Sequence, residues 1–298
     1  MEFLEELEKE MRAHNVFVSE KINLSKKKQR LRRANHTSGK DIFVFIHGNF
    51  EGASYGDWRD EDTWKTWWLN DWNKLTPSEK YERKKLIEVY KTEQLIEKLD
   101  SLKEAKKIWG KTIEADNDHA YLSKKQLWRA PYAKQFEDRL VIPIYDRFAD
   151  LQAIQYIYPT GYKHPEPGTS YKHGHLLLGE ELTEITYICE GWATGVSIYE
   201  ATGNSVIVTF TASNILAIAD LFKSRFPEIH YHICADNDSY GLKNVGFELA
   251  EEAAKFTGST LLIPRFDHLK FEGKPTDFND LMCIAGIEEV EKQLRKMS

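Results

Sequence analysis

Residues 185–210 read ITYICEGWATGVSIYEATGNSVIVTF, and this stretch decides the fold. A short apolar run at 185–190 is followed by a helix-like segment at 192–202 and by a run rich in β-branched residues at 205–210. Short apolar strands that alternate with helices are typical of a parallel sheet with helices on its faces. The stretch therefore predicts an α/β fold.

The alternation continues toward the C-terminus. It predicts a helix over about 213–225, a strand at 229–236, a helix from about Gly241 to Phe256 and a strand at 260–266. Together with the stretch above, these segments predict a parallel sheet flanked by helices over residues 185–266.

Acids stand at the ends of two of these predicted strands. Glu190 follows TYIC, and Asp236 and Asp238 follow HYHICA. The carboxyl ends of parallel strands meet at one edge of a sheet, where ligands bind in folds of this kind. Carboxylates that converge repel one another unless a hard cation joins them, and ligation by oxygen alone favours Mg²⁺ or Mn²⁺. The pattern predicts a divalent-cation site.

A third acidic element, KPTDFNDL at 274–281, offers Asp277 and Asp280. Each acid alone also fits a structural role. Glu190 can cap the following helix, and Asp236 and Asp238 can be turn and N-cap residues. Their shared position at strand ends favours the cation site over these separate roles.

The first half of the chain alternates β-rich and helical segments. Residues 41–59 are rich in aromatic and β-branched residues and predict a small β-unit. From Thr76 to Thr112, apolar residues recur at three-to-four spacing, which predicts a long amphipathic helix or a helix pair. Residues 139–163 predict two strands around the turn DRFAD at 146–150.

Composition excludes several classes of protein. The 298 residues are 41% hydrophobic and 30% charged, enough to bury a core, so global disorder is excluded. No run approaches the roughly 18 consecutive apolar residues of a membrane span, and the N-terminus lacks the pattern of a secretory signal. The three cysteines are isolated and match no zinc-site spacing. We therefore expect a cytoplasmic protein without zinc.

Charge is unevenly distributed along the chain. Residues 21–40 hold eight basic side chains and no acid. This basic run predicts a surface for a polyanion such as nucleic acid, as a secondary contact. The predicted contact residues are Lys26, Lys27, Lys28, Arg30, Arg32 and Arg33. The alternative is a solvated strand edge, where Lys and Arg deter pairing with other strands.

The segments CEGWATG (189–195) and ADNDSYG (235–241) resemble the Toprim domain that bacterial and phage primases, topoisomerases and some nucleases share. The resemblance implies that Glu190 ligates metal or moves protons and that Asp236 and Asp238 hold Mg²⁺. These three residues are therefore the predicted catalytic residues. Asp280 matches the acidic element that follows the last strand in primases and is predicted to be a fourth metal ligand.

Upstream segments resemble the primases of phages and plasmids. The resemblance rests on HAYLSKKQLW (119–128), residues 139–163 and GTSYKHGHLLLG (168–179), although HAYL departs at Ala120 from the more usual His-Pro-Tyr-Leu. It implies four segments: a basic β-rich unit at 1–62, a helical connector at 63–116, an α+β first part of a primase core at 117–178 and a Toprim domain at 179–298.

The resemblance implies a DNA primase, a nucleotidyltransferase that makes short RNA primers on single-stranded DNA. Its partners would be the template and nucleoside triphosphates, with a separate replicative helicase as a candidate partner and no membrane. Both substrates are anionic, so a basic wall should face the acids. The predicted residues of this wall are Lys124, Arg129, Lys134, Arg139, Lys163 and Lys172. Trp128 lies among them and is expected to be in the core, because large aromatic side chains usually supply buried area.

Two alternatives stay open. A Toprim nuclease would use the same acids with water as the nucleophile. A non-catalytic replication adaptor that binds single strands would keep the fold without the chemistry. The primase-like upstream half argues against the nuclease, and the complete set of Glu190, Asp236 and Asp238 argues against the adaptor.

Overall fold

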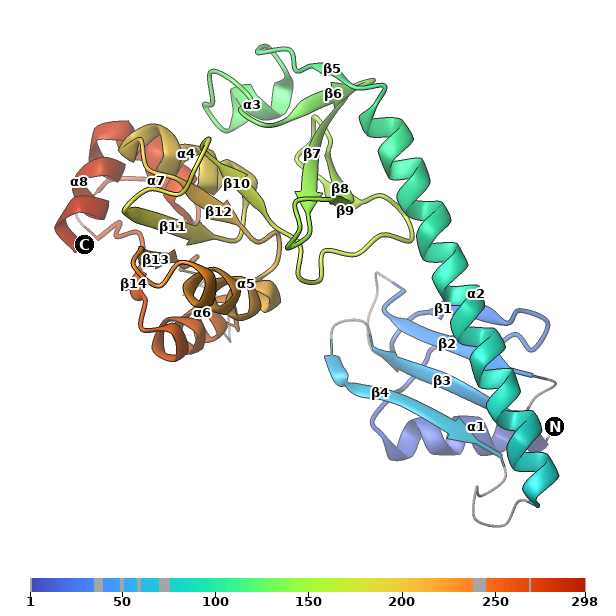
Figure 1. Cartoon of the computed structure of the whole chain (residues 1–298). Coiled ribbons are helices and arrows are strands. Elements are labelled where there is room, and N and C mark those ends of the chain that lie inside the picture. The colour runs from blue at the N-terminus through green and yellow to red at the C-terminus, as the bar shows by residue number, and fades with distance from the viewer. Residues whose placement is uncertain are drawn as a thin grey trace. The chain divides into compact units, whose positions relative to one another are not determined.

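The computed structural model describes residues 2–34, 40–48, 51–57, 60–69, 76–237, 245–267 and 269–297. The protein is of the mixed α/β class, as predicted, and it divides into two compact units, Met1–Ile96 and Glu97–Ser298 (Figure 1). Helix α2 (Pro77–Trp109) begins in the first unit and ends in the second. The four predicted segments stay a prediction, but the boundary at residue 62 falls inside strand β4 (Asp60–Trp68).

The first unit contains a four-stranded antiparallel sheet. Its order is β1 (Lys28–Leu31), β2 (Ile42–His47), β3 (Gly52–Asp57) and β4. Helix α1 (Glu2–Ala13), which the sequence analysis did not predict, packs Phe3, Leu7 and Met11 into the core of this sheet. These residues recur every four positions, so one face of the helix is apolar.

The second unit contains the sheet predicted from residues 185–266. The strand order is β10 (Leu176–Leu178), β12 (Val206–Val208), β11 (Ile185–Cys189), β13 (His230–Cys234) and β14 (Thr260–Leu262). The last four strands run parallel, and β10 pairs antiparallel with β12 at one edge.

Helices cover both faces of this sheet (Figure 1). One face carries α4 (Trp192–Thr202), α7 (Phe278–Ala285) and α8 (Ile287–Met297). The other carries α5 (Ala212–Arg225) and α6 (Val245–Thr257). The predicted strand at 260–266 is shorter than expected, because only its first three residues pair with β13.

An antiparallel sheet precedes the parallel one in the second unit. Its order is β5 (Ile113–Glu114), β6 (Lys134–Phe136), β7 (Arg139–Tyr145), β8 (Leu151–Ile157) and β9 (Lys163–Pro165). Strands β7 and β8 are the two predicted at 139–163. The Asp146 carboxylate closes their turn by accepting hydrogen bonds from the amides of Phe148 (2.8 Å) and Asp150 (3.0 Å).

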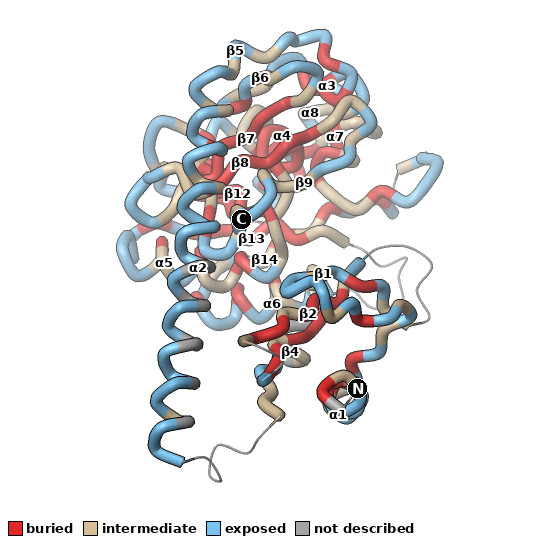
Figure 2. The backbone as a smooth tube through the Cα atoms, turned by 90° about the vertical axis from the view of Figure 1, so that its right-hand side faces the viewer, coloured by how far each residue is buried: buried red, intermediate tan, exposed pale blue. Residues whose placement is uncertain are grey.

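Helix α2 is one continuous helix, and most of its described surface is exposed (Figure 2). Val89, Leu95 and Leu99 belong to its predicted apolar face, yet all three are exposed. Near the C-terminal end of the helix, Ala105 is buried against β7 and β8. Among the side chains that the structure describes, the amphipathic pattern does not lead to burial at Val89, Leu95 and Leu99. None of the helices in the described ranges has the length and apolar character needed to cross a bilayer.

The short helix α3 (Ala120–Lys124) shows why alanine can replace proline at position 120 of the HAYL motif. His119 is its N-cap residue: Nδ1 accepts a hydrogen bond from the Tyr121 amide (3.2 Å), and Nε2 lies 2.9 Å from the Asp138 carbonyl oxygen. Ala120 occupies the first helical position, where proline also fits because the amide there has no partner within the helix. Alanine in place of proline therefore preserves the local structure.

Gly195 allows α4 to approach the sheet closely, and this contact can be tested. A Cβ atom at position 195 would lie 2.7 Å from Cγ2 of Val208 and 3.2 Å from Sγ of Cys189, both of them buried. Overpacking a core costs about 1–3 kcal/mol, more than the ~1 kcal/mol that alanine gains over glycine in a helix. We expect Gly195→Ala to lower the free energy of unfolding measured in urea.

The matched control is Gly246→Ala in α6, where a Cβ atom would meet nothing within 4 Å. This variant should keep or raise the free energy of unfolding. Equal effects of the two substitutions would contradict the close packing at Gly195.

Candidate active site

Glu190 and Asp236 follow two neighbouring strands and lie at the same edge of the parallel sheet. Strands β11 and β13 pair with Cys189 opposite Cys234. Glu190 comes one residue after Cys189, Asp236 comes two residues after Cys234, and both acids are partly exposed. The N-cap residue of α4 is Gly191, so Glu190 does not occupy the cap position. The two acids are therefore neighbours where a ligand can reach them.

The start of α7 brings the third acidic element to this edge. Asp277 is the N-cap residue of α7, and its Oδ1 accepts a hydrogen bond from the Asp280 amide at 2.7 Å. The Asn237 amide donates to the Thr276 carbonyl at 2.7 Å. This bond ties the segment after β13 to the segment before α7, so Asp277 and Asp280 lie beside Asp236.

The charges of these acids act on common neighbours. Burial raises the pKa of the Cys189 thiol well above its ordinary value, and repulsion from Cys234, Asp236, Asp277 and Glu190 raises it further. Burial also raises the pKa of Asp277; Lys125 lowers that pKa, and Asp280 raises it. The carboxylates thus share one electrostatic environment.

Lys125, the C-cap residue of α3, joins the upstream half to this edge. Its Nζ lies 3.3 Å from Oδ1 of Asp280, and both side chains are partly buried. Its carbonyl accepts a hydrogen bond from Nδ2 of Asn279 (2.9 Å), which also donates to Oγ of Ser197 in α4 (3.0 Å). The sequence analysis did not identify the pair of Lys125 and Asp280, whose members are 155 positions apart.

Lys163 and Glu190 line one cavity of about 290 Å³ between β8, β9 and the start of α4. Desolvation lowers the pKa of Lys163, and Lys125 lowers it further, whereas Asp277, Asp236 and Glu190 raise it. The Lys163 ammonium therefore lies within the field of the acids. Lys124 approaches the turn between β8 and β9, which contains Gly161. A Cβ atom at Gly161 would lie 3.8 Å from Nζ of Lys124.

Tyr121 is a site residue that the sequence analysis missed, although it belongs to the HAYL motif. The side chain is buried, and its hydroxyl has no hydrogen-bond partner in the part of the chain that the structure describes. Burial raises the pKa of Tyr121 to about 12. Nζ of Lys163 lies 5.7 Å from the centroid of its ring. A buried, unpaired hydroxyl beside these lysines suits a polar ligand or a bound water.

Three of the other four predicted basic residues contact partners away from the acids, and the fourth, Lys172, is exposed. Arg129 forms an ion pair with Glu200 of α4 at 3.2 Å, and Lys134 lies over the ring of Trp109. The Arg139 guanidinium lies 4.7 Å from the ring centroid of Tyr156. Lys172 is exposed and follows Tyr171, which lines the cavity beside Glu190. The predicted binding roles of these four residues stay predictions.

The expectation that Trp128 lies in the core is wrong. Its side chain is 65% exposed, and the Arg129 guanidinium lies 4.4 Å from its ring centroid. The segment that carries Trp128 passes over α4 on the outside of the core, held there by a hydrogen bond from Nε1 of Trp192 to the Pro131 carbonyl at 3.3 Å.

The basic run lies at the edge of the first unit's sheet, because β1 is an edge strand. Arg33 pairs with the buried Asp57 at 3.1 Å, and Arg32 pairs with Glu20 at 3.0 Å. Lys26 and Lys27 are exposed. The position of the run fits the alternative of a protected strand edge, and contact with DNA stays a prediction.

The acids are suitable donors for Mg²⁺ or Mn²⁺. Asp238 lies outside the described residues, and among those described no group of three or more His, Cys, Asp or Glu side chains is placed to hold a metal ion. Glu190 and Asp236 nevertheless offer carboxylates on adjacent strands. Mg²⁺ is usually bound by one or two carboxylates together with water and substrate phosphates. The donor chemistry therefore fits the predicted cation.

A double-mutant cycle tests the link between Lys125 and Asp280. Lys125→Met should destabilise the protein because it leaves Asp280 without its cation, while Asp280→Asn keeps an acceptor for the Thr276 amide, 2.9 Å away. Contacting partners in such cycles couple by about 0.5–3 kcal/mol, and partial exposure of both side chains places this pair near the lower end. We expect a coupling energy of about 1 kcal/mol from urea unfolding.

Lys125→Arg, which keeps the charge, should retain most of the stability. Additive effects of Lys125→Met and Asp280→Asn would contradict the pairing.

Two curated relatives share part of this sequence. No protein-family model matches the chain. A DNA primase TraC from Escherichia coli is 31% identical over 135 residues, which cover 42% of this chain and 12% of the relative. A second DNA primase TraC from Escherichia coli is 30% identical over 134 residues, covering 42% of this chain and 9% of the relative. The match spans only about a tenth of the length of these relatives.

Solved primase structures are similar at a lower level. The primase fragment of the bacteriophage T7 primase-helicase protein has a TM-score of 0.39 and 14% identity, covering 52% of this chain and 62% of that one. The DnaG primase catalytic domain bound to ssDNA has a TM-score of 0.36 and 16% identity, covering 55% and 53%. TM-scores this low support no argument about function. The comparison therefore rests on the sequence similarity to DNA primase TraC alone. The similarity to DNA primase TraC confirms the resemblance to DNA primases that the motifs predicted.

Proposed function

We propose that this chain is a DNA primase that makes short RNA primers on single-stranded DNA by metal-dependent nucleotidyl transfer. One observation carries the proposal: Glu190 and Asp236 lie at the ends of adjacent parallel strands, and Glu190 lines a cavity together with Lys163. Similarity to DNA primase TraC supports it. In this proposal residues 179–298 are a Toprim domain.

The reaction would join a 3′-hydroxyl to the α-phosphorus of a nucleoside triphosphate and release pyrophosphate. Glu190, Asp236 and Asp238 would hold Mg²⁺ or Mn²⁺, with Asp280 as a further ligand. A bound cation would offset the charge of the phosphate and so promote the attack.

The lysines would bind the triphosphate. Lys124 and Lys163 lie at the turn between β8 and β9, next to the cavity that contains Glu190. Their positive charge would offset the repulsion between an anionic substrate and the carboxylates. Lys125 would keep Asp280 in place through its ion pair.

The proposed partners are a single-stranded template and nucleoside triphosphates, and a separate replicative helicase is a candidate third partner. The cytoplasm is the proposed compartment, because the three cysteines of the chain are isolated in the sequence.

Incubation with labelled nucleoside triphosphates, varied single-stranded templates and Mg²⁺ or Mn²⁺ tests the proposed activity. We expect short labelled RNA products that depend on both template and cation. Cleavage of the template without incorporation would identify a nuclease instead. Binding of single strands without either reaction would identify an adaptor.

Asp236→Asn should abolish incorporation and leave template binding intact or tighter, because it removes a negative charge that repels phosphate. Incorporation is measured with labelled nucleotides, and binding by fluorescence anisotropy of a labelled oligonucleotide. Asp220→Asn, an exposed change on α5, is the matched control and should keep full activity. Full incorporation by Asp236→Asn would contradict the assignment of the acid.

The basic run can be tested without replacing either partner of the ion pairs of Arg32 and Arg33. Replacing Lys26, Lys27 and Lys28 with Gln leaves the pairs of Arg32 and Arg33 intact. If the run contacts DNA, each lost phosphate contact should flatten the slope of log affinity against log salt by about 0.7. Base preference should not change, because phosphate contacts do not read sequence.

Gln at the exposed positions Lys98, Lys103 and Lys106 of α2 removes the same charge and should have no such effect. An unchanged affinity and slope in the first variant would leave the run as a protected strand edge only.

A further inference from the structure

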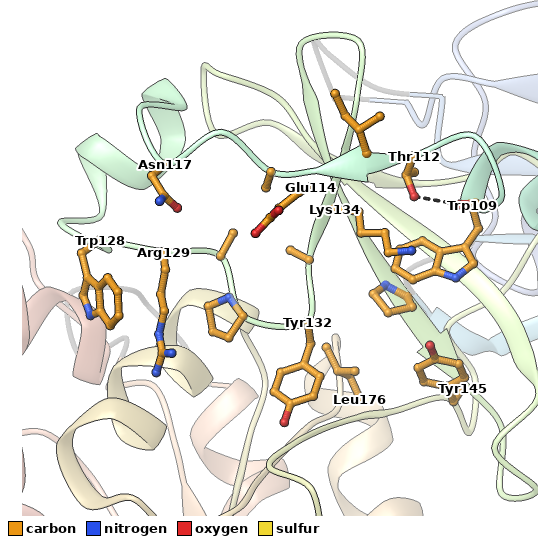
Figure 3. Close-up of a pocket in the computed structure, with 16 residues that line it drawn as sticks. Trp109, Thr112, Glu114, Asn117, Trp128, Arg129, Tyr132, Lys134, Tyr145 and Leu176 are labelled. Atoms are coloured by element: carbon orange, nitrogen blue, oxygen red, sulfur yellow. Dashed lines mark hydrogen bonds between the residues drawn. The ribbon is translucent and has the colours of Figure 1, made fainter.

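One loop, residues 170–175, connects the walls of two cavities in the second unit. The larger cavity, of about 720 Å³, has Tyr145 and Leu176 in its wall (Figure 3). The smaller, of about 290 Å³, is lined by Tyr171 together with Glu190. The conformation of the loop therefore sets the position of the Tyr171 ring in the cavity that contains the acid.

The side chain of Asn214, in α5, holds this loop from the side of the parallel sheet. Its Oδ1 accepts a hydrogen bond from the His173 amide at 3.0 Å, and its Nδ2 donates to the Tyr171 carbonyl at 2.5 Å. Nδ2 also donates to the carbonyl of Thr209, just after strand β12, at 3.0 Å. Asn214 is only 3% exposed, so water cannot replace these partners. One buried amide therefore joins the loop to the end of a parallel strand.

Two residues in the left-handed conformation adjoin these bonds. His173 has a φ of 59°, and its amide is the one that donates to Asn214. Phe210 has a φ of 65° and directly follows Thr209, whose carbonyl accepts from Asn214. Residues other than glycine keep this conformation only where the surrounding structure fixes it, and such residues cluster at functional sites. Removal of the Asn214 amide should therefore let both segments relax.

Both segments lead into the cavity beside Glu190. Tyr171 and Phe210 line it, and their ring centroids lie 5.8 Å apart. The Phe210 amide donates to the Glu190 carbonyl at 2.9 Å, so the same segment also fixes the backbone of the acid. Asn214 does not line the cavity itself. It lies behind two of the aromatic side chains that do.

A second amide holds the same loop from the antiparallel sheet. Nε2 of Gln152, in β8, donates to the carbonyls of Ser170 (2.9 Å) and Lys172 (2.8 Å). The loop is thus held between one side-chain amide of each sheet. Gln152 is partly exposed, so its replacement should disturb the core less than replacement of the buried Asn214.

We propose that Asn214 is a positioning residue for nucleotide binding, because it fixes Tyr171 and Phe210 in the conformation that accepts a nucleoside triphosphate beside Glu190. The inference rests on the proposed primase function and deepens it by naming a residue outside the cavity on which nucleotide affinity depends. Side chains that are ordered before the nucleotide arrives reduce the entropy cost of binding. A merely structural amide would instead stabilise the fold without changing this affinity.

Isothermal titration of the full chain with each of the four nucleoside triphosphates and Mg²⁺, without template, tests the inference. Asn214→Ala should weaken binding about fivefold to a hundredfold, the effect of leaving two side chains to be ordered on binding. Gln152→Ala should weaken it in the same direction. Backbone hydrogen exchange over residues 170–175 should become faster in both variants, because the loop loses bonds that fix it.

Thr257→Ala in α6 is the matched control for the loss of a buried hydrogen bond. Oγ1 of Thr257 donates to the Ala253 carbonyl at 2.7 Å, and Thr257 lines neither cavity. This variant should lower the free energy of unfolding and keep the nucleotide affinity of the unmodified chain. Equal nucleotide affinities of Asn214→Ala and Thr257→Ala would overturn the inference. If Asn214→Ala does not fold, an unchanged affinity in Gln152→Ala would overturn it.

The outcomes separate this inference from the proposed function, because nucleotide binding is read without catalysis. In primer synthesis, Asn214→Ala should raise the KM for nucleotides more than it lowers kcat. Nucleotide binding that depends on Asn214 in a chain that makes no primers would reject the primase and keep the positioning role. Primer synthesis with the same KM in Asn214→Ala as in the unmodified chain would reject the positioning role alone. An unmodified chain that binds no nucleoside triphosphate would reject both.

Discussion

Repulsion among carboxylates at one edge of the parallel sheet is the constraint on which the rest of the second unit depends. The register of β11 and β13 brings Glu190 and Asp236 to that edge, and α7 adds Asp277 and Asp280. Like charges this close, partly removed from water, oppose folding. A chain that gathers them needs cations nearby, and the structure supplies these from outside the parallel sheet.

The antiparallel sheet and α3 supply those cations. Lys163 comes from β9, and Lys125 follows α3. Asn279, fully buried, hydrogen-bonds both to the Lys125 carbonyl and to Ser197 of α4, so the position of Lys125 depends on the packing of three helices. The two sheets of this compact unit share one apolar core, and the cations beside the acids come from α3 and the antiparallel sheet.

The sequence predicted those structural features that depend on residues close together along the chain. An apolar run that ends in an acid placed Glu190 and Asp236 correctly at strand ends, and the turn between β7 and β8 followed from its Asp-rich sequence. Non-local contacts escaped prediction. Strand β1 forms from KQRL, which has no β-branched residue, because β2 pairs with it. The ion pair of Lys125 and exposure of Trp128 depend on how distant segments pack, which spacing along the chain does not reveal.

The central claim is that Glu190 and Asp236 hold a divalent cation together. Titration with Mn²⁺, followed by electron paramagnetic resonance, tests it most directly in the unmodified chain, in Glu190→Gln and in the exposed control Asp220→Asn. The account predicts that the unmodified chain and the control bind Mn²⁺ alike and that Glu190→Gln binds it about tenfold more weakly or not at all. Equal Mn²⁺ affinity in all three proteins would contradict the account.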